Sequence, residues 1–109
     1  CLLLAGSILA AGDSRTTVLG KSSVIGMLGD VGHNCVIKEF SSVEGKSSIS
    51  GHCDLGEHVY IAPMAVTTNR ISVGDHAYLG IGAVAIKDVP EGEKQFGNPA
   101  RKVLELKKK

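Results

Sequence analysis

The sequence predicts an all-β protein, a parallel β-helix wound in triangular coils of 18 residues, and three observations lead to it. Glycine makes up 14 of the 109 residues and aromatic residues only 4%, so Phe, Tyr and Trp cannot fill a core. When the chain is divided into sixes from Leu19, ten of the twelve first positions are branched aliphatic residues. These first positions are Leu19, Ile25, Val31, Ile37, Val43, Ile49, Leu55, Ile61, Thr67, Val73, Leu79 and Ala85. The second position is glycine in six hexads, and the fifth is mostly Ser, Gly, Cys or Ala.

A repeat of six residues requires a short strand followed by a bend, again and again. An α-helix repeats near 3.6 residues and a single strand near 2, so neither accounts for this period. Three sides close one coil, and coils stack at the usual strand spacing of about 4.8 Å. Glycine or a small polar residue is expected at each bend, because it tolerates backbone angles that a bulky side chain resists. The aliphatic residues then form three internal columns: Ile25, Val43, Ile61, Leu79; Leu19, Ile37, Leu55, Val73; and Val31, Ile49, Thr67, Ala85.

The period also divides the chain. Residues 19–90 keep it without a break and are expected to form four coils. The apolar stretch before them is interpreted as part of a first coil whose other sides are missing, in a chain that begins inside a longer domain. From Pro90 on, PEGEKQFGNPARKV breaks the period and predicts a capping strand, and VLELKKK predicts a short helical tail. We therefore expect a β-helix over residues 1–90 and a cap over 91–109, since stacked repeats need their open ends covered.

Composition excludes several partners. The formal net charge is +1, and the only run of charge, Lys107 to Lys109, does not alternate with aromatic residues, so nucleic acid is not an expected partner. The opening CLLLAGSILAAG has no basic flank and is too short to span a bilayer, so neither a membrane segment nor a signal peptide is expected. Cys1, Cys35 and Cys53 follow no disulfide framework. This pattern favours a soluble protein of the reducing cytoplasm.

Three motifs point to one kind of chemistry. The segments VGHNCVIKEFSSV, ISVGDHAYLGIGAVAIKDVPEG and GNPARKV together resemble the acyltransferase domain of bacterial sialic-acid O-acetyltransferases and amino-sugar N-acetyltransferases. The resemblance runs from about Leu3 to Val103. The enzymes that the chain resembles are hexapeptide-repeat acyltransferases. The resemblance implies a left-handed coil, acetyl-CoA as co-substrate, a small sugar-like acceptor of an O- or N-acetyl group, and a homotrimer whose sites lie between chains.

The resemblance assigns His33 as the general base, because a neutral imidazole suits removal of a proton from an attacking hydroxyl or amine near neutral pH. Asn34 stands where relatives carry Glu or Asp, so it can hold the ring but cannot balance an imidazolium charge. Ser42 stands where some relatives have a second histidine, and Lys38 replaces an expected glycine. A backbone amide near Gly51 is expected to polarise the thioester carbonyl. Further expected contacts to the donor are Ala62, Pro63, Gly80, Ile81, Gly82 and Ala83, with Lys87 and Arg101 toward its phosphates.

Two other functions stay open on the same fold. One is a binding or scaffold module without turnover, favoured by Asn34, Lys38 and the missing front of the coil. The other is a metal-dependent lyase, but the three convergent imidazoles that such a site needs are not found in the spacing. His58 and His76 are 18 residues apart and are expected to stack on the surface. Cys35 and Cys53 are also one coil apart, and we expect them to pack inward as small apolar residues.

Overall fold

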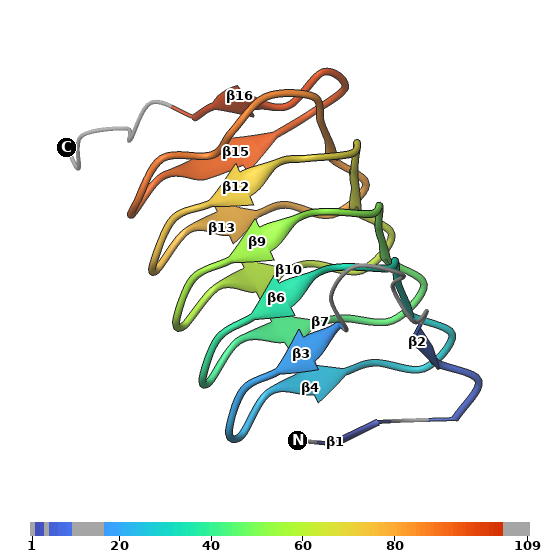
Figure 1. Cartoon of the computed structure of the whole chain (residues 1–109). Coiled ribbons are helices and arrows are strands. Elements are labelled where there is room, and N and C mark those ends of the chain that lie inside the picture. Colours follow the sequence, from blue (N-terminus) through green and yellow to red (C-terminus); the bar gives the residue numbers. More distant parts are fainter. Residues whose placement is uncertain (1, 4, 10–16, 104–109) are drawn as a thin grey trace, which may run out of the picture.

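The computed structural model describes residues 2, 3, 5–9 and 17–103, and they form a left-handed parallel β-helix (Figure 1). Every named element is a strand of two or three residues. The strands of one face are β1 (Leu2–Leu3), β4 (Val24–Ile25), β7 (Ser42–Val43), β10 (Tyr60–Ile61), β13 (Tyr78–Leu79), β15 (Lys94–Phe96) and β16 (Arg101–Lys102). The second face has β2 (Ile8–Leu9), β5 (Asp30–Val31), β8 (Ser48–Ile49), β11 (Val66–Thr67) and β14 (Val84–Ala85). The third face has β3 (Val18–Leu19), β6 (Val36–Ile37), β9 (Asp54–Leu55) and β12 (Ser72–Val73).

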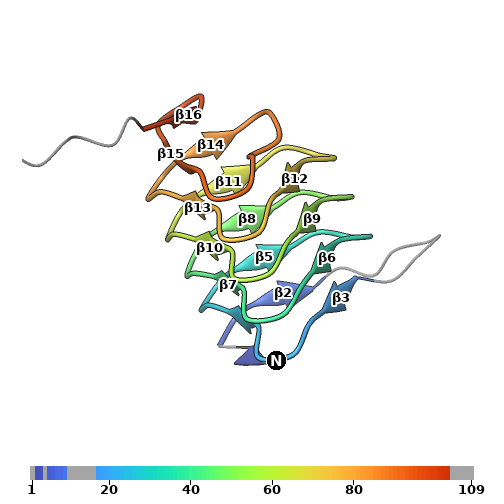
Figure 2. The ribbon, with the colours of Figure 1, turned by 90° about the vertical axis from the view of Figure 1, so that its left-hand side faces the viewer.

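We call these faces sheets A, B and C, in the order in which the chain visits them. From β3, β4 and β5 up to β12, β13 and β14, successive strands within a sheet come from successive coils and pair in parallel with a register shift of 18 (Figure 2). Ile25 thus pairs with Val43, and Val43 with Ile61. The predicted 18-residue coil and its three columns are confirmed.

The columns are the core of the protein. Ile25, Ile37, Val43, Ile61 and Leu79 are fully shielded from solvent, and the fifth hexad position adds small buried side chains between them. Burying one such aliphatic side chain contributes about 1.5 to 3 kcal/mol relative to leaving it exposed. Aliphatic stacking therefore supplies the cohesion for which larger domains use aromatic residues.

The role of glycine differs from the expectation. The bends lie at the third and fourth hexad positions, and the left-handed backbone conformation falls on the fourth, at ten residues other than glycine. They are Ser22, Leu28, Asn34, Phe40, Lys46, His52, His58, Met64, Arg70 and His76. Such a conformation costs roughly 1 to 2 kcal/mol per residue. Hydrogen bonds between coils offset it: the amide of Phe40 donates to the carbonyl of Lys21 at 3.0 Å, and Lys46 donates to Met27 at 2.9 Å.

At Gly26 and Gly32, glycine in the second hexad position is required by the closeness of the next coil. A Cβ atom on Gly26 would lie 2.5 Å from the amide nitrogen of Gly45, and one on Gly32 would lie 2.8 Å from that of Gly51. Both contacts are with backbone, which cannot swing aside. The repeated glycine therefore reflects the close stacking of successive coils. The bends themselves adopt the left-handed conformation at ten residues other than glycine.

Both ends of the coil stack differ from the regular part. Leu2 pairs with Val24 and Ile8 with Asp30, an offset of 22, so β1, β2 and β3 place a strand in all three sheets, where missing sides were expected. At the other end β15 continues sheet A in parallel, and β16 folds back antiparallel on β15. These strands occupy the region where a capping strand was predicted. The predicted helical tail lies mostly beyond Val103, outside the described residues.

Candidate active site

His33 stands on the outside of the coil, at the corner between sheets B and C. The corner consists of the turns that follow the sheet B strands, at residues 33–34, 51–52 and 69–70, and we call it the histidine corner. Since the chain must turn from one face to the next here, the third hexad position points outward and the side chain of His33 is exposed. An exposed imidazole beside a column of turns is accessible to a ligand approaching from solvent.

Asn34 orients this imidazole. Nδ1 of His33 lies 2.8 Å from Oδ1 of Asn34, and the Asn34 side chain is fully buried. Because an amide oxygen only accepts hydrogen bonds, Nδ1 carries the ring proton and donates it to Asn34. In a neutral ring, the other nitrogen, Nε2, then carries the lone pair. The positive φ of 59° at Asn34 is one that Asn tolerates better than most residues, so the residue serves both the turn and the ring.

Gly51 provides the space into which the ring of His33 extends. An added Cβ atom at Gly51 would meet Nε2 of His33 at 2.8 Å and Cε1 at 2.9 Å. In the described part of the chain, the Gly51 amide donates to no protein acceptor. Nε2 of His33 and a backbone N–H without a protein acceptor therefore lie in neighbouring turns of the histidine corner.

His52 completes the surroundings of His33, although its spacing in the sequence indicates no functional role. Its ring centroid is 5.0 Å from that of His33 with the rings at 89°, and its amide donates to the carbonyl of His33 at 2.9 Å. The signal for this contact is the glycine before it, because a side chain at residue 51 would separate the two rings. Spacing by 18 alone pairs His52 with Asn34, not with His33.

Most of the expected donor contacts lie at another corner. Those residues form the turns between sheets A and B, at residues 62–63 and 80–83. Ala62, Gly80 and Ala83 are buried, Pro63 is half-buried, and Gly82 and Ile81 are exposed, Ile81 at 69%. Together with exposed Met27, Leu28 and Met64 they make an apolar corner. Within one chain the strands of sheet B separate this apolar corner from the histidine corner.

The remaining expected residues are dispersed. Ser42 is a half-buried residue of β7 in sheet A, and Arg101 is an exposed residue of β16 at the end of that sheet. Lys87 is exposed in the bend after β14, at the end of the histidine corner. One chain therefore brings His33, Asn34 and Gly51 together and leaves the other predicted residues apart from them.

The third corner carries a ladder of rings. His58 and His76 stack at 5.0 Å with 4° between their planes, as the spacing of 18 predicts, and Phe40 stacks on His58 at 5.0 Å. A similar ladder on sheet A joins Tyr60 to Tyr78 at 4.9 Å. In both ladders, the faces of the rings stack against the rings of the neighbouring coils. We assign these ladders to the cohesion of successive coils.

Cys35 and Cys53 lie inside the histidine corner, fully buried, and both are free thiols. Sγ of Cys35 is 3.2 Å from the carbonyl of Ser50, and Sγ of Cys53 is 3.4 Å from Oγ1 of Thr67. The hydrogen bond to Cys53 raises the pKa of the Cys35 thiol, and burial raises it further. These thiols are thus packing groups with local hydrogen bonds, as predicted.

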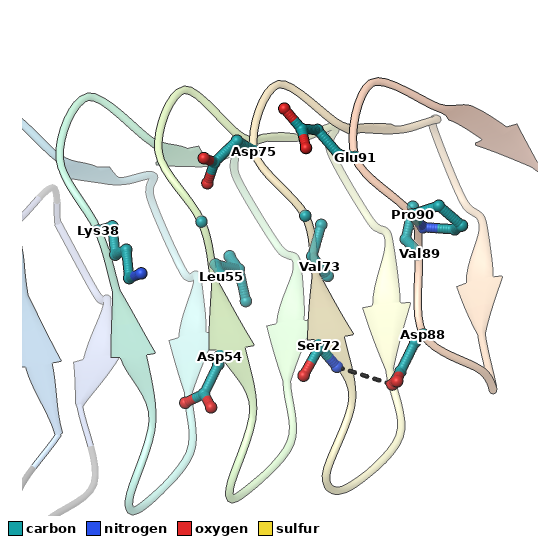
Figure 3. Close-up of a pocket in the computed structure, with 12 residues that line it drawn as sticks. Lys38, Asp54, Leu55, Ser72, Val73, Asp75, Asp88, Val89, Pro90 and Glu91 are labelled. Atoms are coloured by element: carbon teal, nitrogen blue, oxygen red, sulfur yellow. Dashed lines mark hydrogen bonds between the residues drawn. The ribbon is translucent and has the colours of Figure 1, made fainter.

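A shallow hollow of about 380 Å³ lies along sheet C (Figure 3). Four carboxylates line it, those of Asp54, Asp75, Asp88 and Glu91. Two of them serve neighbouring coils: Oδ1 of Asp88 accepts from the Ser72 amide at 2.9 Å, and Oδ1 of Asp75 accepts from the Glu57 amide at 2.9 Å. None of the predicted site residues lines this hollow.

Among the residues that the structure describes, no group of three or more His, Cys, Asp or Glu side chains is placed to hold a metal ion. The same part of the chain contains no helix long and apolar enough to cross a membrane.

Comparisons with known proteins identify relatives. No family model matches the chain. It is 28% identical over 88 residues to the acyl-[acyl-carrier-protein]–UDP-N-acetylglucosamine O-acyltransferase of Pseudomonas putida, covering 81% of this chain and 34% of that protein. The chain therefore spans about a third of the length of this curated relative.

Solved structures that resemble the chain are also acyl- and acetyltransferases. A serine acetyltransferase in complex with CoA superposes with a TM-score of 0.76 at 28% identity, over 80% of this chain and 39% of the other. The UDP-N-acetylglucosamine O-acyltransferase of Moraxella catarrhalis gives a TM-score of 0.86 at 22% identity, over 89% and 39% of the two chains, and supports the fold. The predicted resemblance to hexapeptide-repeat acyltransferases is confirmed.

Proposed function

We propose that this chain is an acyltransferase domain that moves an acetyl group from acetyl-CoA to a hydroxyl or amine of a small sugar-like acceptor. The observation that carries the proposal is the arrangement at His33. Its exposed ring is held at Nδ1 by buried Asn34, and Nε2 lies 2.8 Å from where a Cβ atom on Gly51 would stand. The relatives, which are acyl- and acetyltransferases by name, support the same chemistry.

His33 acts as the base in this proposal. As the acceptor oxygen or nitrogen forms its bond to the thioester carbonyl carbon, Nε2 of His33 takes the proton that the acceptor loses. The ring then carries a positive charge, with Nδ1–H still bonded to Asn34. When the C–S bond breaks, the same proton passes from Nε2 to the leaving thiolate, so the ring returns neutral. A base of this kind contributes about 10² to 10⁴ in rate.

The Gly51 amide is assigned to the developing oxyanion. It is a backbone N–H without a protein acceptor, beside the base. A fixed donor of this kind contributes more to the transition state than to the ground state, because the negative charge on oxygen grows during attack.

A second copy of the chain supplies the other wall of the site in this proposal. The histidine corner and the apolar corner stand at opposite ends of the sheet B strands, so one chain cannot place Ile81 or Gly82 next to His33. In a homotrimer the apolar corner of one copy can face the histidine corner of the next. The small residues there would let a pantetheine arm lie close to the backbone, while Ser42, Lys87 and Arg101 would contact it farther along.

The cellular compartment of the protein is inferred from its thiols. Free, buried Cys35 and Cys53 fit a reducing compartment, and we propose the cytoplasm.

The test combines binding, turnover and assembly. Acetyl-CoA at 100 times its Kd is expected to raise the free energy of unfolding by about 2.7 kcal/mol. Release of CoA thiol is then followed with a panel of amino sugars, for the wild-type protein and for His33→Ala. We expect turnover to vanish in His33→Ala while light scattering still shows a trimer. A monodisperse wild-type monomer, or undiminished turnover in His33→Ala, would contradict the proposal; binding without turnover would favour the scaffold alternative.

A further inference from the structure

The imidazole of His52 packs against the imidazole of His33, the proposed base. The rings of His33 and His52 meet at right angles, 89°, with centroids 5.0 Å apart. Perpendicular contact is one of the two arrangements that aromatic rings prefer, because the electropositive edge of one meets the electronegative face of the other. The contact joins consecutive coils, since residue 52 lies one coil beyond Asn34.

The backbone fixes the distance between the two rings. The His52 amide donates to the His33 carbonyl at 2.9 Å, which locks the two bends together. Gly51, between them, has no side chain, and the ring of His33 occupies the space that a Cβ atom would fill. The ring of His33 is therefore bounded by the Gly51 backbone and by the ring of His52.

If the imidazole of His33 were held only by the hydrogen bond at Nδ1, it could still rotate out of the corner toward solvent. The bond to Asn34 fixes one atom, and His33 is exposed on its outer side. A neighbouring ring at right angles opposes that rotation, because the contact is lost when the plane turns. Holding a reacting group in its productive orientation is worth more than its contribution to stability suggests, since small displacements reduce rate steeply.

We propose that His52 is a positioning residue: it keeps the His33 ring in the orientation in which Nδ1 bonds Asn34 and Nε2 is presented over Gly51. This inference rests on the proposed function for its effect on rate, but its effect on the ring of His33 does not. The role belongs to the ring of His52 as a shape and not to its protons.

The chain offers matched variants. His52→Asn removes the ring, and Asn is known to tolerate this bend, since Asn34 occupies the same hexad position at φ 59°. His52→Phe keeps a ring, and Phe40 occupies the equivalent position at φ 62°. His76→Asn is the control, because His76 has φ 62° and a ring contact but lies at another corner.

The first measurement is steady-state kinetics with acetyl-CoA. We expect His52→Asn to lower kcat about two- to tenfold, the size of one perpendicular ring contact, with KM for acetyl-CoA unchanged. His52→Phe should recover most of the wild-type kcat, and His76→Asn should retain it. An unchanged kcat in His52→Asn, an equal loss in His76→Asn, or a loss in His52→Phe as large as in His52→Asn would overturn the inference.

The second measurement does not need turnover. Long-range ¹H–¹⁵N spectra of the histidine side chains report which nitrogen of neutral His33 carries the proton. We expect the Nδ1–H form in the wild-type protein and in His52→Phe, and a mixture of both forms in His52→Asn. If the wild-type protein transfers no acetyl group, the proposed function fails and these spectra still decide the role of His52; identical His33 signals in wild type and His52→Asn would overturn it.

Discussion

Nε2 of His33 lies 2.8 Å from the point where Gly51 would carry a Cβ atom. The base and the backbone that faces it are thus fitted to each other through the absence of one side chain. The φ of Gly51 is not in the left-handed region, so the bend does not need glycine for its own sake. Glycine is needed at residue 51 because the ring of His33 occupies the space that a side chain would fill.

Gly51→Ala should therefore impair catalysis more than folding. The new methyl group would push the His33 ring off its orientation, and displacements of about 1 Å can reduce rates on the order of 10²-fold. We expect kcat/KM to fall by about that factor, with the thermal midpoint nearly unchanged. Gly45→Ala is the control, since Gly45 holds the same hexad position and its added Cβ would meet no ring, only the Met27 backbone, with the carbonyl oxygen at 3.2 Å and the amide nitrogen at 4.0 Å. Equal activity in the two variants would contradict this role of Gly51.

Asn34→Asp should raise kcat. A carboxylate would keep the bond to Nδ1 and also stabilise the imidazolium, and charge-assisted hydrogen bonds are roughly twice as strong as neutral ones. A gain of about fivefold at neutral pH corresponds to an extra 1 kcal/mol. Asn34→Leu removes the acceptor and should reduce kcat about tenfold. Rates at saturating acetyl-CoA, compared with thermal midpoints, check both; the hydrogen bond would have no role in catalysis if neither rate changed.

Ile61→Ala should strongly destabilise the β-helix. Ile61 is completely buried in the middle of the sheet A column, and truncating such a side chain typically costs 2 to 5 kcal/mol, about 3 kcal/mol in the central case. Ile86→Ala serves as the comparison, because Ile86 is 51% exposed and its loss should cost well under 1 kcal/mol. Urea unfolding followed by circular dichroism measures both. A similar cost at the two sites would contradict the assignment of the column as the core.

The thiols of Cys35 and Cys53 should react only when the protein unfolds. Both are fully buried, and the pKa of Cys35 is raised by its hydrogen bond to Cys53 and by burial, which keeps it protonated at neutral pH. In a variant with Cys1→Ser, Ellman's reagent should label no thiol in buffer and two in 6 M guanidinium chloride. Labelling of either thiol in buffer, at a rate faster than global unfolding, would be inconsistent with this packing.

A large part of the fold was predictable because its period is local. A strict repeat of six, read from residues such as Ile25, Val43 and Ile61, fixes which side chains face inward, and stacking by 18 follows from three sides per coil. The same logic predicted the stacked pair His58 and His76 and the buried pair Cys35 and Cys53. The resemblance supplied the hand of the coil and the identity of His33.

The sequence by itself determined the three columns, since they depend only on spacing along the chain, and its resemblance to a known family added the candidate base. It did not determine why glycine repeats, which is a matter of backbone packing between coils, as at Gly26 and Gly45. Nor did it pair His33 with His52 or separate His33 from Ile81: which side chains meet depends on the corner at which each turn falls and on how far a ring extends past its own coil. Those relationships are decided by three-dimensional packing, because side-chain reach and the width of a sheet are not written in the period of the sequence.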